Sequence, residues 1–553
     1  MDCISTRLPY RQTSYFTKII LDYLDHAEAL RPFYAHQPSL QGLQKAIDSK
    51  KNFSNRKTLA EQLQKQYDQV PGKEATKKNI DALLSPNTFT ITTAHQPNIF
   101  TGPLYFIYKI IHAIRLSQTC KASMPGYHFV PVFYMGSEDA DLEELGHIYL
   151  GGQKIEWKTK QTGAVGRMKV DKEFIRLIES IEGQLAVLPF GNEIISMIRD
   201  CYKEGMLIQD ATFKFVHAMF GDHGLIVLIP DNAMLKKQAI PIFEDDLLNE
   251  TPSVIVEQTA SRLHGVGYKL QANPREINLF YLKDGIRERI VRKNSGSKDR
   301  KPGSSGSIAD FKVLRGSSPE QGSEISFTEK DLLKELQDHP ERFSPNVILR
   351  GIYQETILPN IVYIGGGGEI AYWLQLKDLF EHYKVPFPVL LLRNSFLIVE
   401  RRWQKRISQL GFTVEDFFLP EHELVNKLVA RESKNEIKLN GNFSDAEKLY
   451  ESLKKQAVAV DTSLARHVEA LKTQSMYRLQ ELEKKMLRAE KRKFADQQRQ
   501  IHTIRENLFP KNGLQERIEN VTYYYAKWGS AFFAQIFQHS LSLEQEFVIL
   551  SER

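Results

Sequence analysis

Short apolar runs constrain the fold of this chain more than any other feature of its sequence. Five such runs, rich in β-branched and aromatic residues and separated by helical patterns, cover residues 89–93, 129–134, 225–229, 361–364 and 389–392. Strands that are apolar along most of their length suit a sheet that helices cover on both faces. The order of strands and helices therefore predicts an α/β fold with an open, doubly wound parallel sheet.

The patterns between these runs divide the chain into six expected segments. INLFYL and IRERIV flank Asp284 and Gly285, which predicts a β-hairpin because Asp-Gly allows the positive φ of a tight turn. We interpret the Gly- and Ser-rich stretch 294–307 as a flexible surface loop, with a mobile lid as the alternative. The expected segments are an N-terminal helical segment at 1–85, the first half of the core at 86–231, an inserted connecting domain at 232–345, the second half of the core at 346–440, a coiled coil at 441–510, and a C-terminal helix and tail at 511–553.

Residues 444–508 contain neither proline nor glycine. Within them, positions recur at spacings close to four and three, the seam pattern of a coiled coil; these are Leu464, Val468, Leu471, Ser475, Leu482, Met486 and Ala489. A single helix of this length spans roughly 95 Å at about 1.5 Å per residue. The segment predicts a long α-helical coiled coil and, through it, a homodimer. A helical hairpin that packs on its own domain is the alternative.

Composition limits the partners of this chain. Its 74 basic and 68 acidic residues leave a formal net charge of +6, and the densest basic stretch, 484–499, reads as a solvated helix face rather than a nucleic-acid site. Three distant cysteines without a CxxC pair suit a reducing compartment. No signal peptide, membrane-spanning run or metal-binding signature is present in the sequence. We therefore expect a cytoplasmic protein that binds neither nucleic acid nor membrane.

Open α/β sheets bind ligands at the carboxyl ends of their strands, and three loops follow predicted strands there. The first, 93–105, leads into a helix N-terminus that favours an anion. His95 is a candidate catalytic residue that could donate a hydrogen bond to a phosphoryl or acyl oxygen. Candidate substrate- or nucleotide-binding residues in the same region are Gln96, Asn98, Thr101, Gly102, Tyr105 and Lys109. The alternative is that His95 and Asn98 only satisfy the backbone of the loop.

The second loop, 136–144, places five carboxylates directly after an apolar run. Glu138 and Asp139 lie nearest to the strand end and are candidate catalytic residues, since carboxylates there could bind an ammonium group or Mg²⁺, or act as a general base. Asp141 is a candidate binding residue. Acids from 141 to 144 would equally suit the first turn of a helix, where they match the helix dipole.

The third loop is the run of four glycines at 365–368, which allows a ligand to approach the backbone closely. Candidate binding residues here are Gly365, Gly366, Glu369, Tyr372 and Trp373, together with Arg350, which precedes the strand and could pair with a carboxylate. The alternatives are that Glu369 caps its helix, that the two aromatic residues belong to the core, and that Arg350 forms a surface salt bridge.

Three motifs at these loops resemble the BshC family, the cysteine ligases of bacillithiol biosynthesis. They are HQPNIFTGPLYFIYKI at 95–110, VPVFYMGSEDADLEEL at 130–145 and YIGGGGEIAYWLQLK at 363–377, and QERIENVTYYYAKWG near the end is also similar to the family. The resemblance implies a Rossmann-like core with inserted connecting segments and a coiled-coil dimerisation domain. It further implies a core similar to nucleotidyl-transferring enzymes of the class I aminoacyl-tRNA synthetase type.

The resemblance implies that the carboxyl of cysteine is joined to the amine of glucosaminyl-malate through an activated cysteinyl intermediate. ATP or another nucleotide would supply the energy, and Mg²⁺ would be a further candidate cofactor. His95 and the helix that begins near Gly102 would stabilise charge, while Glu138 or Asp139 would hold the cysteine ammonium or deprotonate the amine. The glycine loop and Glu369 would hold nucleotide or sugar hydroxyls, and Arg350 the malate carboxylates.

Two positions depart from the family pattern. Ala140 stands where relatives have a histidine between the acids, and Gly367 stands where they have a proline. His95 or His147 would then have to replace the missing histidine if it were the general base. Two other functional classes therefore stay open, another class I-like adenylate-forming enzyme or nucleotidyltransferase and a non-catalytic coiled-coil dimer that senses a nucleotide.

Overall fold

The structure is a computed structural model that describes residues 1–68, 70–293, 310–314, 325–435 and 438–553. The described residues form two compact units, one of residues 1–398 and 513–553 and the other of residues 399–512. In neither unit does a described helix combine the length and the apolar character needed to cross a membrane.

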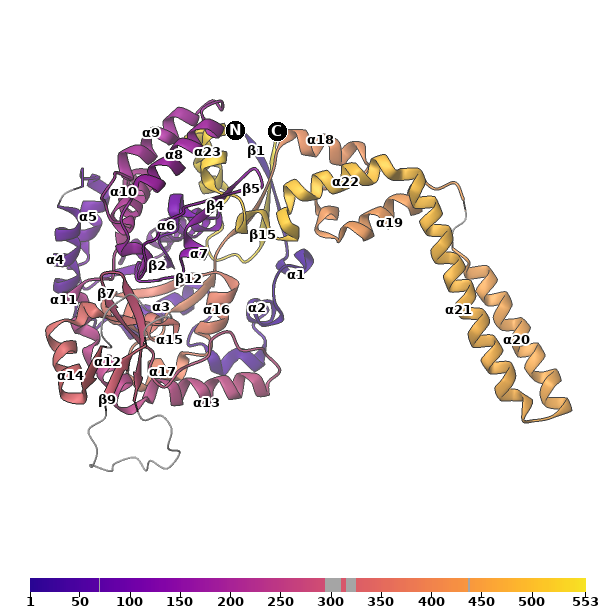
Figure 1. The fold of residues 1–553 in the computed structure, drawn as a ribbon, viewed down its shortest axis with the longest axis horizontal. Coiled ribbons are helices and arrows are strands. Elements are labelled where there is room, and N and C mark those ends of the chain that lie inside the picture. Colours follow the sequence, from indigo (N-terminus) through magenta and orange to yellow (C-terminus); the bar gives the residue numbers. More distant parts are fainter. Residues whose placement is uncertain (69, 294–309, 315–324, 436–437) are drawn as a thin grey trace. The chain divides into compact units, whose positions relative to one another are not determined.

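The first unit is built on a five-stranded sheet of order β13-β12-β2-β3-β6 (Figure 1). Its strands are β2 (Thr88–His95), β3 (His128–Met135), β6 (Ile226–Leu228), β12 (Asn360–Gly365) and β13 (Val389–Leu392). All neighbouring strands pair in parallel, so the predicted α/β fold with a parallel sheet is confirmed. The pairing of β2 with β3 sets His95 beside Met135, which brings the first two predicted loops to the same edge.

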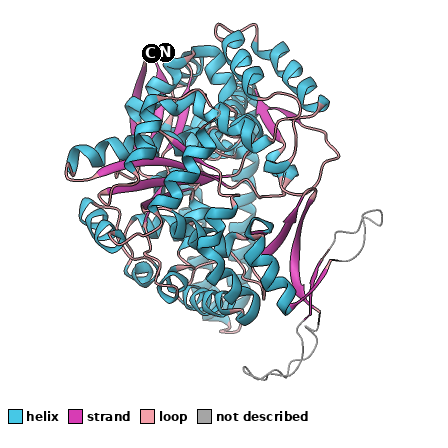
Figure 2. Cartoon of the chain, turned by 90° about the vertical axis from the view of Figure 1, so that its left-hand side faces the viewer, coloured by secondary structure: helices cyan, strands magenta, loops and turns pink. Residues whose placement is uncertain are grey.

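Helices lie on both faces of this sheet, which explains its apolar strands (Figure 2). On one face, Ile107 and Ile111 of α6 (Tyr105–Ser123) share a core cluster with Phe133, and Ile47 of α3 (Leu40–Lys50) shares another with Ile91. The longer of the other helices in this unit are α4 (Arg56–Tyr67), α5 (Glu74–Ala82), α8 (Lys172–Leu185), α9 (Gly191–Cys201), α10 (Ile208–Phe220), α12 (Ile240–Asn249), α13 (Thr251–Gly265), α14 (Glu329–Asp338), α15 (Val347–Ile357), α23 (Val521–Trp528) and α24 (Ser530–His539).

The two ends of the chain meet in a small antiparallel sheet. β1 (Cys3–Leu8) pairs with β15 (Phe547–Glu552), and β14 (Ser395–Val399) completes the sheet. A strand at the start of the expected N-terminal helical segment was not predicted. Four of its six residues are exposed, so it lacks the apolar pattern by which a strand is recognised, and its partner is the opposite end of the sequence.

The predicted hairpin is confirmed: β7 (Leu279–Lys283) pairs antiparallel with β8 (Ile286–Arg292), and Gly285 in the turn has a φ of 70°. The two strands belong to a second sheet, of order β10-β9-β8-β7-β11, with β9 (Asp310–Val313), β10 (Ser326–Thr328) and β11 (Phe343–Pro345). The Gly- and Ser-rich stretch 294–307 lies outside the described residues.

The second unit is helical, with α18 (Arg401–Gln409), α19 (Glu421–Glu432), α20 (Asn440–Val460), α21 (Leu464–Lys491) and α22 (Ala495–Leu508). The prediction of one continuous helix over 444–508 is wrong, because α20 and α21 form an antiparallel hairpin (Figure 1) in which Lys454 Nζ lies 3.0 Å from Glu469 Oε2. Asp461 is extended, and its Oδ1 accepts the Ser463 N–H at 2.7 Å. A local side-chain hydrogen bond thus ends α20 without glycine or proline.

Candidate active site

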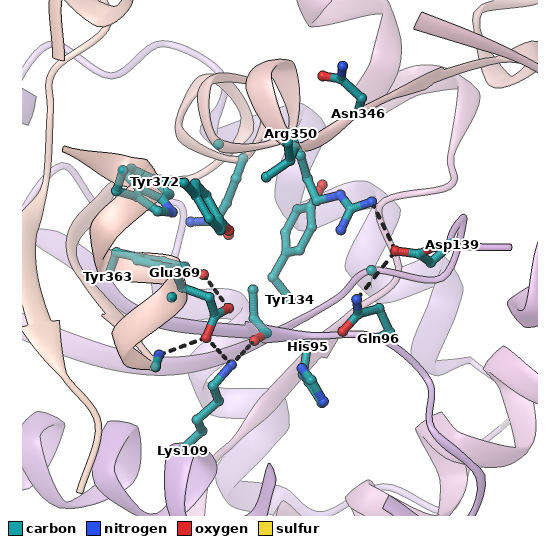
Figure 3. A pocket seen from close by; sticks show the side chains of 18 of the residues that line it. His95, Gln96, Lys109, Tyr134, Asp139, Asn346, Arg350, Tyr363, Glu369 and Tyr372 are labelled. Carbon is teal, nitrogen blue, oxygen red and sulfur yellow. Dashed lines mark hydrogen bonds and ion pairs between the residues drawn. The ribbon is translucent and has the colours of Figure 1, made fainter. Parts of the chain in front are cut away.

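A cavity of about 450 Å³ opens at the carboxyl ends of β2, β3 and β12. That volume lies within the range of small-molecule sites. Ten of the predicted site residues line it, namely His95, Gln96, Tyr105, Lys109, Asp139, Arg350, Gly366, Glu369, Tyr372 and Trp373. The remaining six do not, namely Asn98, Thr101, Gly102, Glu138, Asp141 and Gly365. Figure 3 shows Arg350, Asp139 and Gln96 together on one side of the view, and Glu369, Lys109 and Tyr363 on the other.

His95 ends the central strand, and its ring stands edge-on to Tyr105 and Phe106 at centroid distances of 5.2 and 5.5 Å. Its Nε2 atom is buried and has no hydrogen-bond partner among the described residues. Burial, and then the nearby charge of Lys109, lower the pKa of His95 well below its ordinary value. The imidazole is therefore neutral at pH 7, and its residue forms part of the cavity wall.

The rest of the first loop faces the C-terminal segment instead of the cavity. Asn520 Nδ2 donates to the carbonyl oxygens of Phe100 at 3.0 Å and Gly102 at 2.5 Å, and the Leu104 N–H donates to the Glu519 carbonyl at 2.8 Å. Asn98 and Thr101 are buried within this packing, with 2% and 0% of their surface exposed. This contact with a distant part of the chain keeps Asn98, Thr101 and Gly102 out of the cavity.

In the second loop, Asp139 and Glu138 are neighbours with different environments. Asp139 Oδ2 lies 3.3 Å from Gln96 Nε2 and 3.5 Å from Arg350 Nη2. Burial opposes its ionisation, but Arg350 and Arg287 lower the pKa of Asp139, which is therefore a carboxylate at neutral pH. Glu138 is buried, with 5% exposure, and forms an ion pair with the fully buried Lys236. Of the two candidate catalytic acids, only Asp139 reaches the cavity.

Two further acids and a histidine of this region have local roles. Asp141 is exposed and accepts the Glu144 N–H at 3.0 Å, so it caps the short helix α7 (Leu142–Leu145), as the alternative interpretation expected. His147 Nδ1 lies 2.8 Å from the Glu143 carbonyl and is not part of the cavity wall. Glu144 lines the cavity, and burial together with Asp141 raises the pKa of its carboxyl.

The third loop is organised by Glu369. Its Oε2 accepts the Gly366 N–H at 2.7 Å, its Oε1 accepts the Tyr363 hydroxyl at 2.8 Å, and the carboxylate also forms an ion pair with Lys109. Lys109 donates in addition to the Ala94 carbonyl at 2.8 Å. Glu369 thus caps α16 (Gly367–Trp373) and ties the glycine loop to α6. Trp373 is buried, with 1% exposure, and stacks on Tyr363 at 4.3 Å.

Three cations of the cavity wall, Arg287, Arg393 and Arg517, are absent from the sequence-based prediction. Arg393 directly follows β13, so the rule that ligands bind at strand ends could have identified it; it donates to Glu516 Oε1 at 2.7 Å. Arg287 lies on β8, and no local pattern reveals that this hairpin reaches the cavity. With Lys109, Arg350 and Arg517, the wall holds five basic side chains against the acids Asp139, Glu144 and Glu369, which favours an anionic ligand.

The family models and the relatives that match this chain carry the same family name. Residues 1–394 match the model of the BshC N-terminal Rossmann-like domain of bacillithiol biosynthesis, and residues 396–552 match that of the BshC C-terminal coiled-coil domain. Two relatives are named "Putative cysteine ligase BshC". The one from Flavobacterium psychrophilum is 37% identical to this chain over 553 residues, which cover 99% of both chains. The one from Flavobacterium johnsoniae is 38% identical over 555 residues, which cover 100% of this chain and 99% of the relative.

A solved structure from Campylobacter jejuni, titled "putative arginyl t-RNA synthetase", has 12% identity and covers 82% of this chain and 99% of its own, but its TM-score of 0.19 is too low to support an inference. Both family models and the full-length relatives agree with the Rossmann-like sheet and the helical second unit described above. The chain belongs to the BshC family.

Proposed function

We propose that this chain is a ligase that joins the carboxyl group of cysteine to the amine of glucosaminyl-malate and so forms an amide. The names of its relatives support the class of cysteine ligases. The observation that carries the proposal is the convergence of His95, Asp139 and the glycine loop on one cavity. These groups follow three different strands, and together they offer a neutral base, a carboxylate and a backbone surface within one site.

The cavity contains groups suited to each requirement of the reaction. The amine nitrogen attacks the activated carbonyl carbon, a C–N bond forms, the bond to the leaving group breaks, and the nitrogen loses one proton. Asp139 is ionised and has a lowered pKa, which makes it a good partner for the cysteine ammonium and a weak base. The amine nitrogen becomes positively charged and acidic as it attacks, so even a neutral imidazole with a lowered pKa can take up its proton, and we assign that role to His95 in the cavity wall.

The glycine loop suits a nucleotide. Gly366, Gly367 and Gly368 line the cavity with backbone, and a Cβ at Gly366 would lie 3.3 Å from Glu369 Oε2 and 3.7 Å from Arg393 Nε, in space that a ligand could otherwise use. Gly366–Gly368 would hold the nucleotide, with Lys109 and Arg393 supplying positive charge. When bound, ATP would supply the activation of the cysteine carboxyl, since amide formation from a free carboxylate is uphill in water.

The test is a reaction of the purified full-length chain with cysteine, glucosaminyl-malate, ATP and Mg²⁺, followed by mass spectrometry of the thiol products. We expect the cysteinyl amide of glucosaminyl-malate, and its loss when any one substrate is omitted. ATP–pyrophosphate exchange with a different amino acid and no such amide would instead assign another adenylate-forming activity. Nucleotide binding without turnover would assign a sensor. Thiol profiles of cells with and without the chain provide the matching test in vivo.

A further inference from the structure

Arg287 lines the cavity, and among the described residues its guanidinium forms no ion pair. Its guanidinium lies over the Phe280 ring at 4.1 Å, and its Nε donates to Ser344 Oγ at 3.2 Å. Among the described residues, neither Nη nitrogen has a hydrogen bond or an ion pair. Stacking on an aromatic ring and a bond from Nε fix the plane of the guanidinium and leave its two-pronged edge available.

Arg350 provides a second guanidinium in the same wall. It lies one turn into α15, and its Nη1 is 3.6 Å from the position that a Cβ of Gly136 would occupy. Its carboxylate partner is Asp139, at 3.5 Å. Burial and the charge of Arg350 lower the pKa of Arg287 to about 10. Two neighbouring guanidinium groups therefore share Asp139, since the other nearby carboxylate, Glu138, is paired with Lys236, and an anionic ligand would stabilise this arrangement.

The hairpin that carries Arg287 is held against the core by a close backbone contact. Thr162 Oγ1 donates to the Gly285 carbonyl at 2.9 Å. Gly163 has a φ of 88°, and a Cβ there would lie 2.7 Å from both Gly285 C and Ile286 N. The approach of the two segments therefore requires glycine at position 163. This contact fixes the position of β8, and with it the position of Arg287.

We propose that Arg287 and Arg350 together form a dicarboxylate subsite that binds the malate part of the amine substrate. The inference rests on the function proposed above, in which that substrate is glucosaminyl-malate. Malate linked through its hydroxyl keeps two free carboxylates, and a guanidinium binds a carboxylate through two parallel hydrogen bonds. Two fixed guanidinium groups in one wall match two carboxylates, and the subsite accounts for the choice of this sugar over a neutral glucosaminide.

The phosphates of a nucleotide are the other polyanion that two arginines could bind. The nucleotide assigned above lies along the glycine loop, whose hydrogen bonds run to Glu369 and through it to Lys109. In Figure 3 that group and the group of Arg350 and Asp139 occupy opposite sides of the view. We therefore assign the arginine pair to the amine substrate and leave the glycine loop to the nucleotide.

Steady-state kinetics of Arg287→Ala and Arg287→Lys test the subsite. We expect KM for glucosaminyl-malate to rise about tenfold to hundredfold in Arg287→Ala, the effect of losing hydrogen bonds to a charged group, with KM for cysteine and ATP unchanged. Arg287→Lys should recover only part of the loss, because lysine cannot make the paired hydrogen bonds. The wild-type preference for glucosaminyl-malate over a methyl glucosaminide should largely disappear in Arg287→Ala.

Two further variants separate the effect of the position of Arg287 from the effect of removing a positive charge from its strand. Gly163→Ala keeps Arg287 but displaces its hairpin, and should raise KM for glucosaminyl-malate as well. Arg289→Ala removes an exposed arginine from the same strand that does not line the cavity, and should leave all three KM values unchanged. Thermal melting verifies that each variant is folded. A raised KM for ATP with an unchanged KM for glucosaminyl-malate would overturn the subsite and assign the arginines to the nucleotide.

Calorimetric titration with glucosaminyl-malate and with malate tests the subsite without turnover. Binding that weakens tenfold or more in Arg287→Ala but not in Arg289→Ala supports the dicarboxylate subsite, even if the ligase reaction fails. Equal binding by the wild-type chain and Arg287→Ala overturns it, even if the ligase reaction is found. The two proposals therefore fail independently.

Discussion

At the scale of single residues, the charge state of His95 connects the structure with catalysis. The folded protein holds its pKa well below 6.5, because burial and the cation Lys109 disfavour the imidazolium. Protonation would therefore remove the base only as the pH falls through that lowered value. Between pH 6.5 and 8 the ring stays neutral, and kcat should not report the titration of an ordinary histidine.

We expect His95→Ala to lower kcat by about a hundredfold to ten-thousandfold, the usual contribution of a positioned acid or base, with little change in KM. The measurement is kcat as a function of pH for both proteins, with thermal melting as a check of folding. In the wild-type chain, any acidic limb due to His95 should lie well below pH 6.5. Turnover that survives the substitution would exclude His95 from the mechanism.

A second residue-scale prediction concerns the buried ion-pair network behind the cavity. Lys236 pairs with Glu138 and lies 3.5 Å from Asp231, which also binds Arg167 at 2.7 Å. Lys236→Met leaves Glu138 buried without its cation, so the free energy of unfolding should decrease by about 3–5 kcal/mol. Urea denaturation of the full chain measures it.

The double variant Lys236→Met with Glu138→Gln provides the control for this network. It removes the unpaired charge, so it should be more stable than the single variant Lys236→Met. A double variant that is no more stable than the single one would mean that buried charge is not the cause of the loss.

At the scale of elements, the loop between β2 and α6 depends on the C-terminal segment. Phe100 and Thr101 adopt left-handed backbone conformations, with φ of 48° and 68°, and Asn520 bonds the carbonyls on either side of Thr101. Without Asn520 these buried carbonyls would lose their partner. The loop that carries His95 into α6 would then be held less firmly.

We expect Asn520→Ala to lower the free energy of unfolding by about 1–3 kcal/mol for each buried carbonyl left without a donor. It should also lower kcat, because His95 lies at the start of the same loop. Chemical denaturation and steady-state kinetics measure the two effects. Glu552→Ala, a half-buried position at the other end of the C-terminal segment, serves as the control, and equal losses in both variants would argue against a specific role for Asn520.

The strands and the helical hairpin show where prediction of elements succeeds and fails. The strands of the parallel sheet are recognisable because each is apolar along its length and is followed by a helical pattern. The break between α20 and α21 is not recognisable from the sequence, because aspartate and serine, the residues at 461 and 463, also occur within helices. Only the hydrogen bond between them, and the return of α21 along α20, marks the turn.

At the scale of the whole molecule, we propose that the hairpin of α20 and α21 mediates a homodimer. Five of its leucines are exposed, namely Leu449 at 57%, Leu453 at 40%, Leu464 at 38%, Leu471 at 41% and Leu482 at 48%. Burying a leucine contributes about 1.5–3 kcal/mol, so a second copy would stabilise this surface. Sedimentation equilibrium should show a dimer for the wild-type chain.

The double variant Leu449→Glu and Leu453→Glu should shift that equilibrium towards the monomer. Ser452→Glu, which adds one glutamate to an exposed position of the same helix without removing a leucine, should leave the dimer intact. A wild-type chain that sediments as a monomer at all concentrations would contradict the proposal.

The sequence by itself determined the parallel sheet and the places where its strands end, because apolar runs and helical periodicity are local properties of the chain. It also determined that His95, Asp139 and the glycine loop would meet, since the carboxyl ends of parallel strands lie at one edge of a sheet. Only the tertiary structure decided that Asp139 enters the cavity while its neighbour Glu138 turns to Lys236. The tertiary structure likewise places Arg287, which lies on a distant hairpin, in the cavity wall. Contacts between remote segments depend on packing, and no local sequence pattern predicts them.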